Sequence, residues 1–206
     1  MAYASWLKPS KVSGNGNDTV NVSAQSDNTG RNARQTEITF KAANCQDVVR
    51  QVTQAGKPEF VNIQSTASVS KSGGTLTISG TTNSSKLTFE FANGKSLELT
   101  LPATYTANSV STKNGEAVSG DPGATQEFAF SIQFSGIGAN DATSPKTAQL
   151  IVKDSAGHSS TCTITQAAGD ATLSVTPESV QLDWDAKTSG STASFSVSSN
   201  TDWTVE

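Results

Sequence analysis

His158 is the only histidine in the chain, and imidazole is a common group for metal binding and nucleophilic catalysis. It lies in the turn-like segment DSAGHSS, without a second histidine or a thiol at a metal-ligand spacing. A transition-metal site needs three or four such ligands, so none is predicted. A serine–histidine–aspartate triad needs a buried carboxylate behind the imidazole, and a histidine in a turn is not expected to have one.

Carboxylates are the next groups that could do chemistry. Asp183 and Asp185 form an acidic pair and Asp18 lies beside the segment NGN, but Ca²⁺ would require backbone carbonyls to converge on them. We interpret these residues as parts of solvated surfaces. No nucleophile, general base or catalytic pair of carboxylates is recognisable, so the sequence predicts a protein that is not an enzyme and uses no cofactor.

Aromatic side chains could bind carbohydrate, because sugar rings stack their C–H faces on Trp and Tyr. The chain has three Trp and two Tyr. Trp184 alternates with Val180 and Leu182, which predicts that its side chain faces a core. Tyr105 falls in a long connection and is predicted to be exposed, so it is the main candidate for ligand binding; Tyr3 is a second.

The composition indicates thin β-sheets with polar outer faces. Hydrophobic residues make up 34% of the 206 residues, and they recur in short alternating runs. The net charge of −4 comes without a basic cluster, so we predict no nucleic-acid partner. No apolar run approaches the roughly 20 residues of a membrane span, so we predict no membrane partner.

The first residues, MAYASWLKPSKVSG, lack the basic and apolar regions of a signal peptide. We therefore expect the chain to be made in, and to stay in, the cytoplasm of its host cell. Cys45 and Cys162 are too few for a disulfide framework and lie in separate units, so both are expected to be free thiols.

An internal repeat divides the chain. The segment QVTQAG ends at Gly56 and the segment TITQAAG ends at Gly169, each after a strand and a short turn. A new unit starts after each ending. The predicted domains are residues 1–57, 58–169 and 170–206. Arg50 falls at the repeat position of Cys162, which leaves open either a bulge or a one-residue slip of the alignment.

The central unit, residues 58–169, carries successive runs of period-two alternation, such as Leu97 and Leu99. Asn93-Gly94 between two such runs is the strongest hairpin signal in the chain. About seven short strands separated by turn residues are typical of an immunoglobulin-like sandwich. The predicted fold class is therefore all-β, with tandem immunoglobulin-like β-sandwiches.

The end units are predicted to be incomplete sandwiches. Residues 171–206 look like opening strands and residues 3–56 look like closing strands, so neither can bury its apolar face alone. The connection 103–126 is longer than an ordinary sandwich loop. It is either a binding or assembly element or a mobile segment.

The end units resemble the BACON domain, an immunoglobulin-like module of Bacteroidetes proteins and of the phages that infect them. The resemblance is carried by SSNTDWTVE at residues 198–206, by SWLKPS at residues 5–10 and by the ending VTQAG. In the family these motifs run consecutively, whereas here the opening motif follows the closing one. The middle unit keeps only the final strands of the pattern.

The resemblance implies a role in binding or assembly. BACON modules are associated with carbohydrate or mucin binding, and they also occur in virion proteins of crAss-like phages of Bacteroides. It therefore implies a virion structural protein, an auxiliary or decoration protein on the capsid surface that contacts the major capsid protein. The alternative is a carbohydrate-binding module that recognises glycans.

Three ways of completing the end units are open: closure within one chain, strand exchange with a second copy, or a continuation of the chain. The linkers between units are only a few residues long, at about 3.3–3.6 Å each, so they cannot easily carry one end unit past the central sandwich to the other. This favours strand exchange between copies and a head-to-tail homo-oligomer. Trp6 and Trp203 match core positions of the BACON pattern. The residues predicted to form the shared core and assembly surface are Trp6, Trp184, Trp203, Phe195 and Val197.

Overall fold

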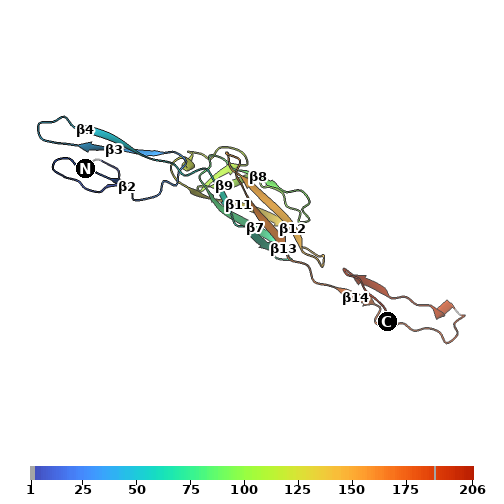
Figure 1. Cartoon of the computed structure of the whole chain (residues 1–206). Coiled ribbons are helices and arrows are strands. Elements are labelled where there is room, and N and C mark those ends of the chain that lie inside the picture. The colour runs from blue at the N-terminus through green and yellow to red at the C-terminus, as the bar shows by residue number, and fades with distance from the viewer. Residues whose placement is uncertain (1–2, 188) are drawn as a thin grey trace.

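The structure is a computed structural model that describes residues 3–187 and 189–206. It consists of β-strands and two single-turn 3₁₀ helices in its described parts, drawn out into a central body with a smaller unit at each end (Figure 1). The predicted fold class is confirmed: the protein is all-β, with an immunoglobulin-like sandwich and incomplete end units. Within the described residues, no helix has the length and apolar character needed to cross a membrane.

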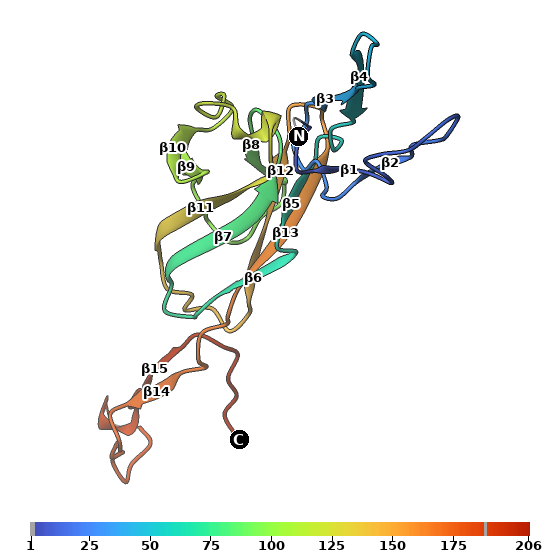
Figure 2. The same ribbon diagram turned by 90° about the vertical axis from the view of Figure 1, so that its left-hand side faces the viewer.

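The central body is a sandwich of two sheets (Figure 2). The first sheet has the order β10 (Val110–Lys113), β9 (Thr104–Ala107), β11 (Phe128–Ile137), β7 (Gly74–Thr82) and β5 (Val61–Ile63). The second has the order β6 (Thr66–Val69), β13 (Ser159–Gln166), β12 (Lys146–Lys153) and β8 (Thr88–Phe91). Neighbouring strands are antiparallel except β6 and β13, which run parallel.

The alternation of apolar residues places every second side chain of these strands in one core. Ile132 of β11 and Leu150 of β12 come from opposite sheets and are both at most 2% exposed. The Phe89 ring packs between the sheets, with its centroid 6.0 Å from that of Phe130. Each such side chain contributes roughly 1.5–3 kcal/mol through burial, so the central sandwich has a core of its own.

The end units contain only two-stranded sheets. The N-terminal half-domain (residues 3–57) pairs β1 (Leu7–Pro9) with β2 (Val22–Ala24), and β3 (Arg34–Phe40) with β4 (Val48–Gln54). The C-terminal half-domain (residues 170–206, without 188) pairs β14 (Leu173–Thr176) with β15 (Ser196–Ser199) and has a 3₁₀ turn, Ser189–Ser191. The two half-domains lie at opposite ends of the central sandwich (Figures 1 and 2).

The connection 103–126 is more ordered than its length suggested. It contains the hairpin β9–β10 and a 3₁₀ turn, Pro122–Ala124. Asn108 and Ser109, at the tip of the hairpin, have φ values of 46° and 65°. A two-residue turn in which both residues have positive φ has a backbone twist that matches the twist of the two strands it joins. This part of the connection is therefore a strand hairpin at the edge of the first sheet and not a loop.

Candidate assembly site

An apolar cleft lies in the N-terminal half-domain, where the β1–β2 hairpin faces the β3–β4 hairpin. Its volume is about 620 Å³, and its lining includes Ile38 and Phe40 of β3 together with Val12 and Val20 of the β1–β2 connection. Phe40 is 43% exposed and Val12 is 74% exposed. Two-stranded sheets need a further layer to be stable in water, so the cleft is a site that another element can cover.

The N-terminal half-domain repeats the closing half of the central sandwich. Ile38 of β3 lies opposite Arg50 of β4, as Leu150 of β12 lies opposite Cys162 of β13, and both pairs differ by 112 positions in sequence. The register of β3–β4 is continuous, so Arg50 occupies the place of Cys162 without a bulge or a slip. Leu150 and Cys162 are fully buried, whereas Arg50 is exposed. The half-domain therefore lacks the layer that covers this position.

The C-terminal half-domain repeats the opening half of the central sandwich. Leu173 of β14 pairs with Ser199 of β15, as Val61 of β5 pairs with Thr82 of β7. The exposed fractions of the two apolar residues differ sharply, at 61% for Leu173 and 5% for Val61. The strand pairing is thus the same in both places. The described part of the C-terminal half-domain lacks both the strand that flanks β7, which is β11 in the central sandwich, and the covering second sheet.

Two equivalent asparagines hold the half-domains to the central sandwich. At the first junction the amide nitrogen of Asn83 donates to the carbonyl oxygens of Thr29 and Pro58, each at 3.3 Å, and to that of Lys57 at 3.1 Å. The N–H group of Phe60 donates to the Asn83 amide oxygen at 3.0 Å. Asn83 is fully buried, so these bonds are shielded from water and fix the first junction.

The second junction repeats this arrangement. The amide nitrogen of Asn200 donates to the carbonyl oxygens of Asp141 at 2.9 Å and Asp170 at 2.8 Å, and its amide oxygen accepts from the N–H of Thr172 at 2.8 Å. Asp141, Asp170 and Thr172 each follow their first-junction equivalents by 112 positions. The chain therefore attaches successive sandwiches by one repeated geometry.

A second pair of asparagines confirms the period within the closing halves. The amide nitrogen of Asn28 donates to the carbonyl oxygens of the residues 4 and 27 positions later, and that of Asn140 does the same. Sequence reasoning missed all four asparagines. Asn28 and Asn140 could have been found, because they precede Gln54 and Gln166 of the two repeat endings by the same distance.

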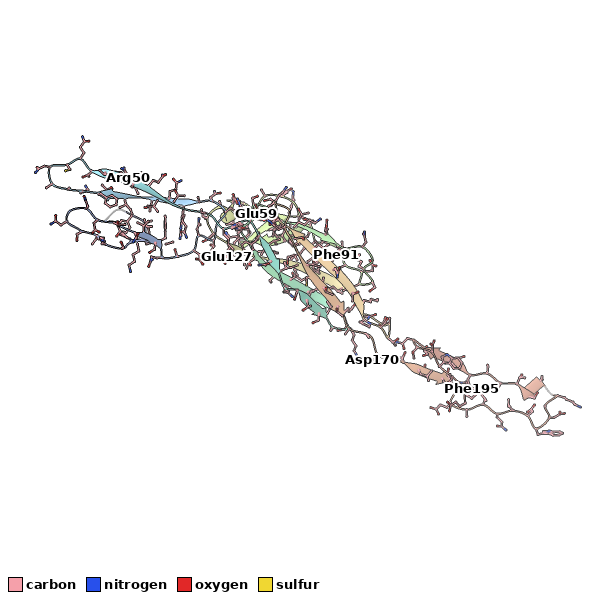
Figure 3. The ribbon with its side chains drawn as sticks, in the orientation of Figure 1. Arg50, Glu59, Phe91, Glu127, Asp170 and Phe195 are labelled. Atoms are coloured by element: carbon pink, nitrogen blue, oxygen red, sulfur yellow. The ribbon has the colours of Figure 1, made fainter. Side chains whose placement is uncertain are left out.

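The residues predicted for core and assembly all lie in the half-domains. They are Trp6, Trp184, Trp203, Phe195 and Val197. Trp184 is 95% exposed, Phe195 and Trp203 are each 50% exposed, and Val197 of β15 is half-buried. In Figure 3, Phe195 lies on the C-terminal half-domain and Arg50 on the N-terminal one, with the central sandwich between them. The chain does not bring the two sets of residues together by itself.

Trp6 is half-buried beside the β1–β2 hairpin. The guanidinium carbon of Arg34 lies 4.9 Å from the centroid of its ring, a distance at which a cation is attracted to the ring face. Arg34 also donates through Nε to the side-chain oxygen of Gln54, at 2.8 Å. Trp6 thus connects the two hairpins of the N-terminal half-domain.

The structure contradicts the prediction that Tyr105 is an exposed ligand-binding residue. Tyr105 is only 3% exposed, and its ring centroid lies 4.8 Å from that of Phe89 in the central core. It faces inward because β9 adds to the edge of β11 and turns alternate side chains toward the second sheet. The connection 103–126 therefore offers no tyrosine platform for a sugar.

Burial raises the pKa of the Tyr105 hydroxyl above its ordinary value of 10.0. The folded protein then holds this proton more tightly than the unfolded chain, so the stabilisation is complete below pH 10 and is lost as the pH rises through the raised pKa. We expect Tyr105→Phe to remove this part of the loss, whereas Tyr3→Phe retains it. Urea unfolding between about pH 8 and pH 11 measures the difference; identical pH profiles for both variants would contradict it.

His158 has a buried carboxylate beside it, contrary to expectation. Its Nδ1 lies 2.7 Å from Oδ2 of Asp154, whose side chain has no exposed surface. The other oxygen of Asp154 accepts from the N–H groups of Ala156 and His158, which is the pattern of a turn-stabilising aspartate. Among the described residues no serine or threonine hydroxyl bonds to this ring, and no group of three potential metal ligands is found.

A family model of known proteins matches the N-terminal half-domain. None of the curated proteins is similar enough to the chain to count as a match. The matching family model is named BACON and described as "Putative binding domain, N-terminal". Residues 1–55, which include both walls of the cleft, are therefore similar to a binding domain of the BACON family.

Proposed function

We propose that this protein is a non-enzymatic structural protein that assembles head to tail through its half-domains. In this proposal the C-terminal half-domain of one copy completes the N-terminal half-domain of the next. One observation supports it above the others: the chain presents an opening half and a closing half of the same sandwich, at opposite ends of a complete one.

The proposed interface is heterologous, because the two surfaces that meet are different. Repeated addition of copies then gives a ring or a filament, depending on the rotation between neighbours. The junction asparagines Asn83 and Asn200 hold both half-domains in a defined direction, which favours a regular assembly over a flexible one.

Apolar burial supplies the driving force for this assembly. Trp184 is 95% exposed, and covering a side chain of its size removes roughly 150–250 Å² from water. At about 25 cal/mol per Å² this is worth about 4–6 kcal/mol before the entropy of association is subtracted. Phe195 and Trp203, each half exposed, lie in the same half-domain, and covering them adds to this gain.

The setting we propose is a virion, where the protein acts as an auxiliary or decoration protein on a phage capsid and contacts the major capsid protein. The support is the resemblance of the terminal motifs to BACON modules, which include virion proteins. A sandwich array with polar outer faces suits this role. Synthesis in the host cytoplasm belongs to the same proposal. Antibody labelling of virions from a phage that encodes the chain tests the location.

Sedimentation velocity over a wide range of concentrations tests the assembly itself. We expect species larger than the 21.3 kDa chain that grow with concentration, and rings or filaments by electron microscopy. A monodisperse monomer at all concentrations would overturn the proposal.

The second candidate function is carbohydrate binding, which is favoured by the family description and by a cleft that Tyr3 helps to line. A glycan array with the same samples tests it. Sugar binding by a monomer would replace assembly as the function.

A further inference from the structure

We propose a specific register for the completed sandwich: residues 179–182 of one copy add to β4 of the next copy as a parallel strand. In this register Ser179 lies beside Gln51 and Gln181 beside Thr53. The inference rests on the proposed head-to-tail assembly and identifies the site, the occupant and the alignment of the strands.

The central sandwich provides the template. There β6 runs parallel to β13, with Thr66 beside Thr163 and Ser68 beside Thr165. The strand equivalent to β13 is β4, because β3–β4 and β12–β13 share one register. In the N-terminal half-domain β4 pairs with β3 alone, so its outer edge is open where β13 has β6. An open strand edge is a template for strand addition.

The C-terminal half-domain contains the matching strand. Val180 and Leu182 alternate as Ala67 and Val69 do in β6. Val180 follows Leu173 by seven positions, whereas Ala67 follows Val61 by six, so the two spacings differ by one residue. Val69 is 6% exposed in the central core, whereas Leu182 is 54% exposed. Residues 179–182 therefore have the apolar alternation of β6 but lack the core that buries β6.

Phe195 of the C-terminal half-domain corresponds in sequence to a residue of the layer that the cleft lacks. Phe195 follows Ile78 by 117 positions, the same offset that relates Ser199 to Thr82 and Asn200 to Asn83. Ile78 is fully buried beneath the second sheet. Phe195 is therefore placed to enter the cleft lined by Ile38 and Phe40.

The charges of the two half-domains are complementary. Residues 1–57 carry seven Lys and Arg against four Asp and Glu, a net charge of +3. Residues 170–206 carry one Lys against six Asp and Glu, a net charge of −5. Opposite charges speed encounter between unlike ends, and like charges oppose pairing between two identical ends. A second copy of this chain, presented head to tail, is therefore the occupant that fits the cleft.

Cysteine pairs test the register in the full chain, with exposed Cys45 replaced by Ser. Under mild oxidation we expect Gln51→Cys/Ser179→Cys and Thr53→Cys/Gln181→Cys to give a ladder of covalent multimers. The crossed pairs, Gln51→Cys/Gln181→Cys and Thr53→Cys/Ser179→Cys, use the same positions. In the crossed pairs the two cysteines are two residues out of register, so their Cα atoms lie about 8 Å apart, which is too far for a disulfide. We therefore expect loss of the ladder in both crossed pairs.

Sedimentation of the reduced samples separates the two proposals. Assembly with ladders only from the matched pairs supports the register. Assembly with ladders from the crossed pairs, or from none, overturns the register while head-to-tail assembly stands. Monomers that give no ladder overturn both, and a disulfide formed within a single chain overturns exchange between copies.

Discussion

An equal mixture of Ile38→Glu and Phe195→Asp chains should form dimers and nothing larger. Ile38→Glu places a carboxylate in the cleft, and Phe195→Asp removes an apolar side chain from the partner surface and adds a charge. An unpaired buried charge costs several kcal/mol, so each variant alone should associate at least about 100-fold more weakly than the original chain. In the mixture, one intact cleft meets one intact C-terminal half-domain, and growth stops there.

Sedimentation equilibrium of each variant and of the mixture measures this outcome. Val110→Glu is the matched control for Phe195→Asp, because Val110 is, like Phe195, an exposed apolar residue, at 42%, but lies in the central sandwich. It should assemble like the original chain. Either variant alone forming long assemblies, or the mixture remaining monomeric while the original chain assembles, would show that the cleft and Phe195 do not belong to one interface.

Asn83→Ala should lower the stability of the central sandwich by roughly 2–4 kcal/mol, or about 10 °C in melting temperature. The substitution removes the donor to three carbonyl oxygens and leaves the N–H of Phe60 without its acceptor at a buried site. A buried polar group without a partner loses its hydration and gains nothing in return. Differential scanning calorimetry measures the shift.

Two variants serve as controls for Asn83→Ala. Asn62→Ala changes an exposed asparagine of β5 and should leave the melting temperature nearly unchanged. Asn200→Ala changes the equivalent asparagine of the second junction, which attaches the exposed C-terminal half-domain, so it should affect the central transition less than Asn83→Ala. Equal effects for Asn83→Ala and Asn62→Ala would show that the first junction is not a stabilising network.

Local pattern explains what could be predicted of the fold. Alternation such as that of Phe130 and Ile132 predicts strands, because successive side chains of a strand point to opposite faces. The same rule applied to Tyr105 and Ala107 predicts β9, whereas the length of the connection 103–126 favours a loop; the structure follows the alternation. The repeat endings at Gln54 and Gln166 predicted the internal repeat, and the structure gives its offset as 112 positions.

The candidate site was only partly predictable. The sequence indicated that Trp184, Trp203 and Phe195 belong to a core, and all three are exposed in the single chain. The cleft that Ile38 and Phe40 line could not be predicted, because it depends on how two hairpins distant in sequence face each other.

The sequence by itself determined the strands, the repeat and the incompleteness of the end units, because these follow from local alternation and turn residues. Only the tertiary structure decided which groups meet across the chain: Asn83 with the backbone of Thr29, His158 with a buried Asp154, and Tyr105 with Phe89. The physical reason is that side-chain period fixes the face of a strand, whereas the partner on that face depends on sheet order and register.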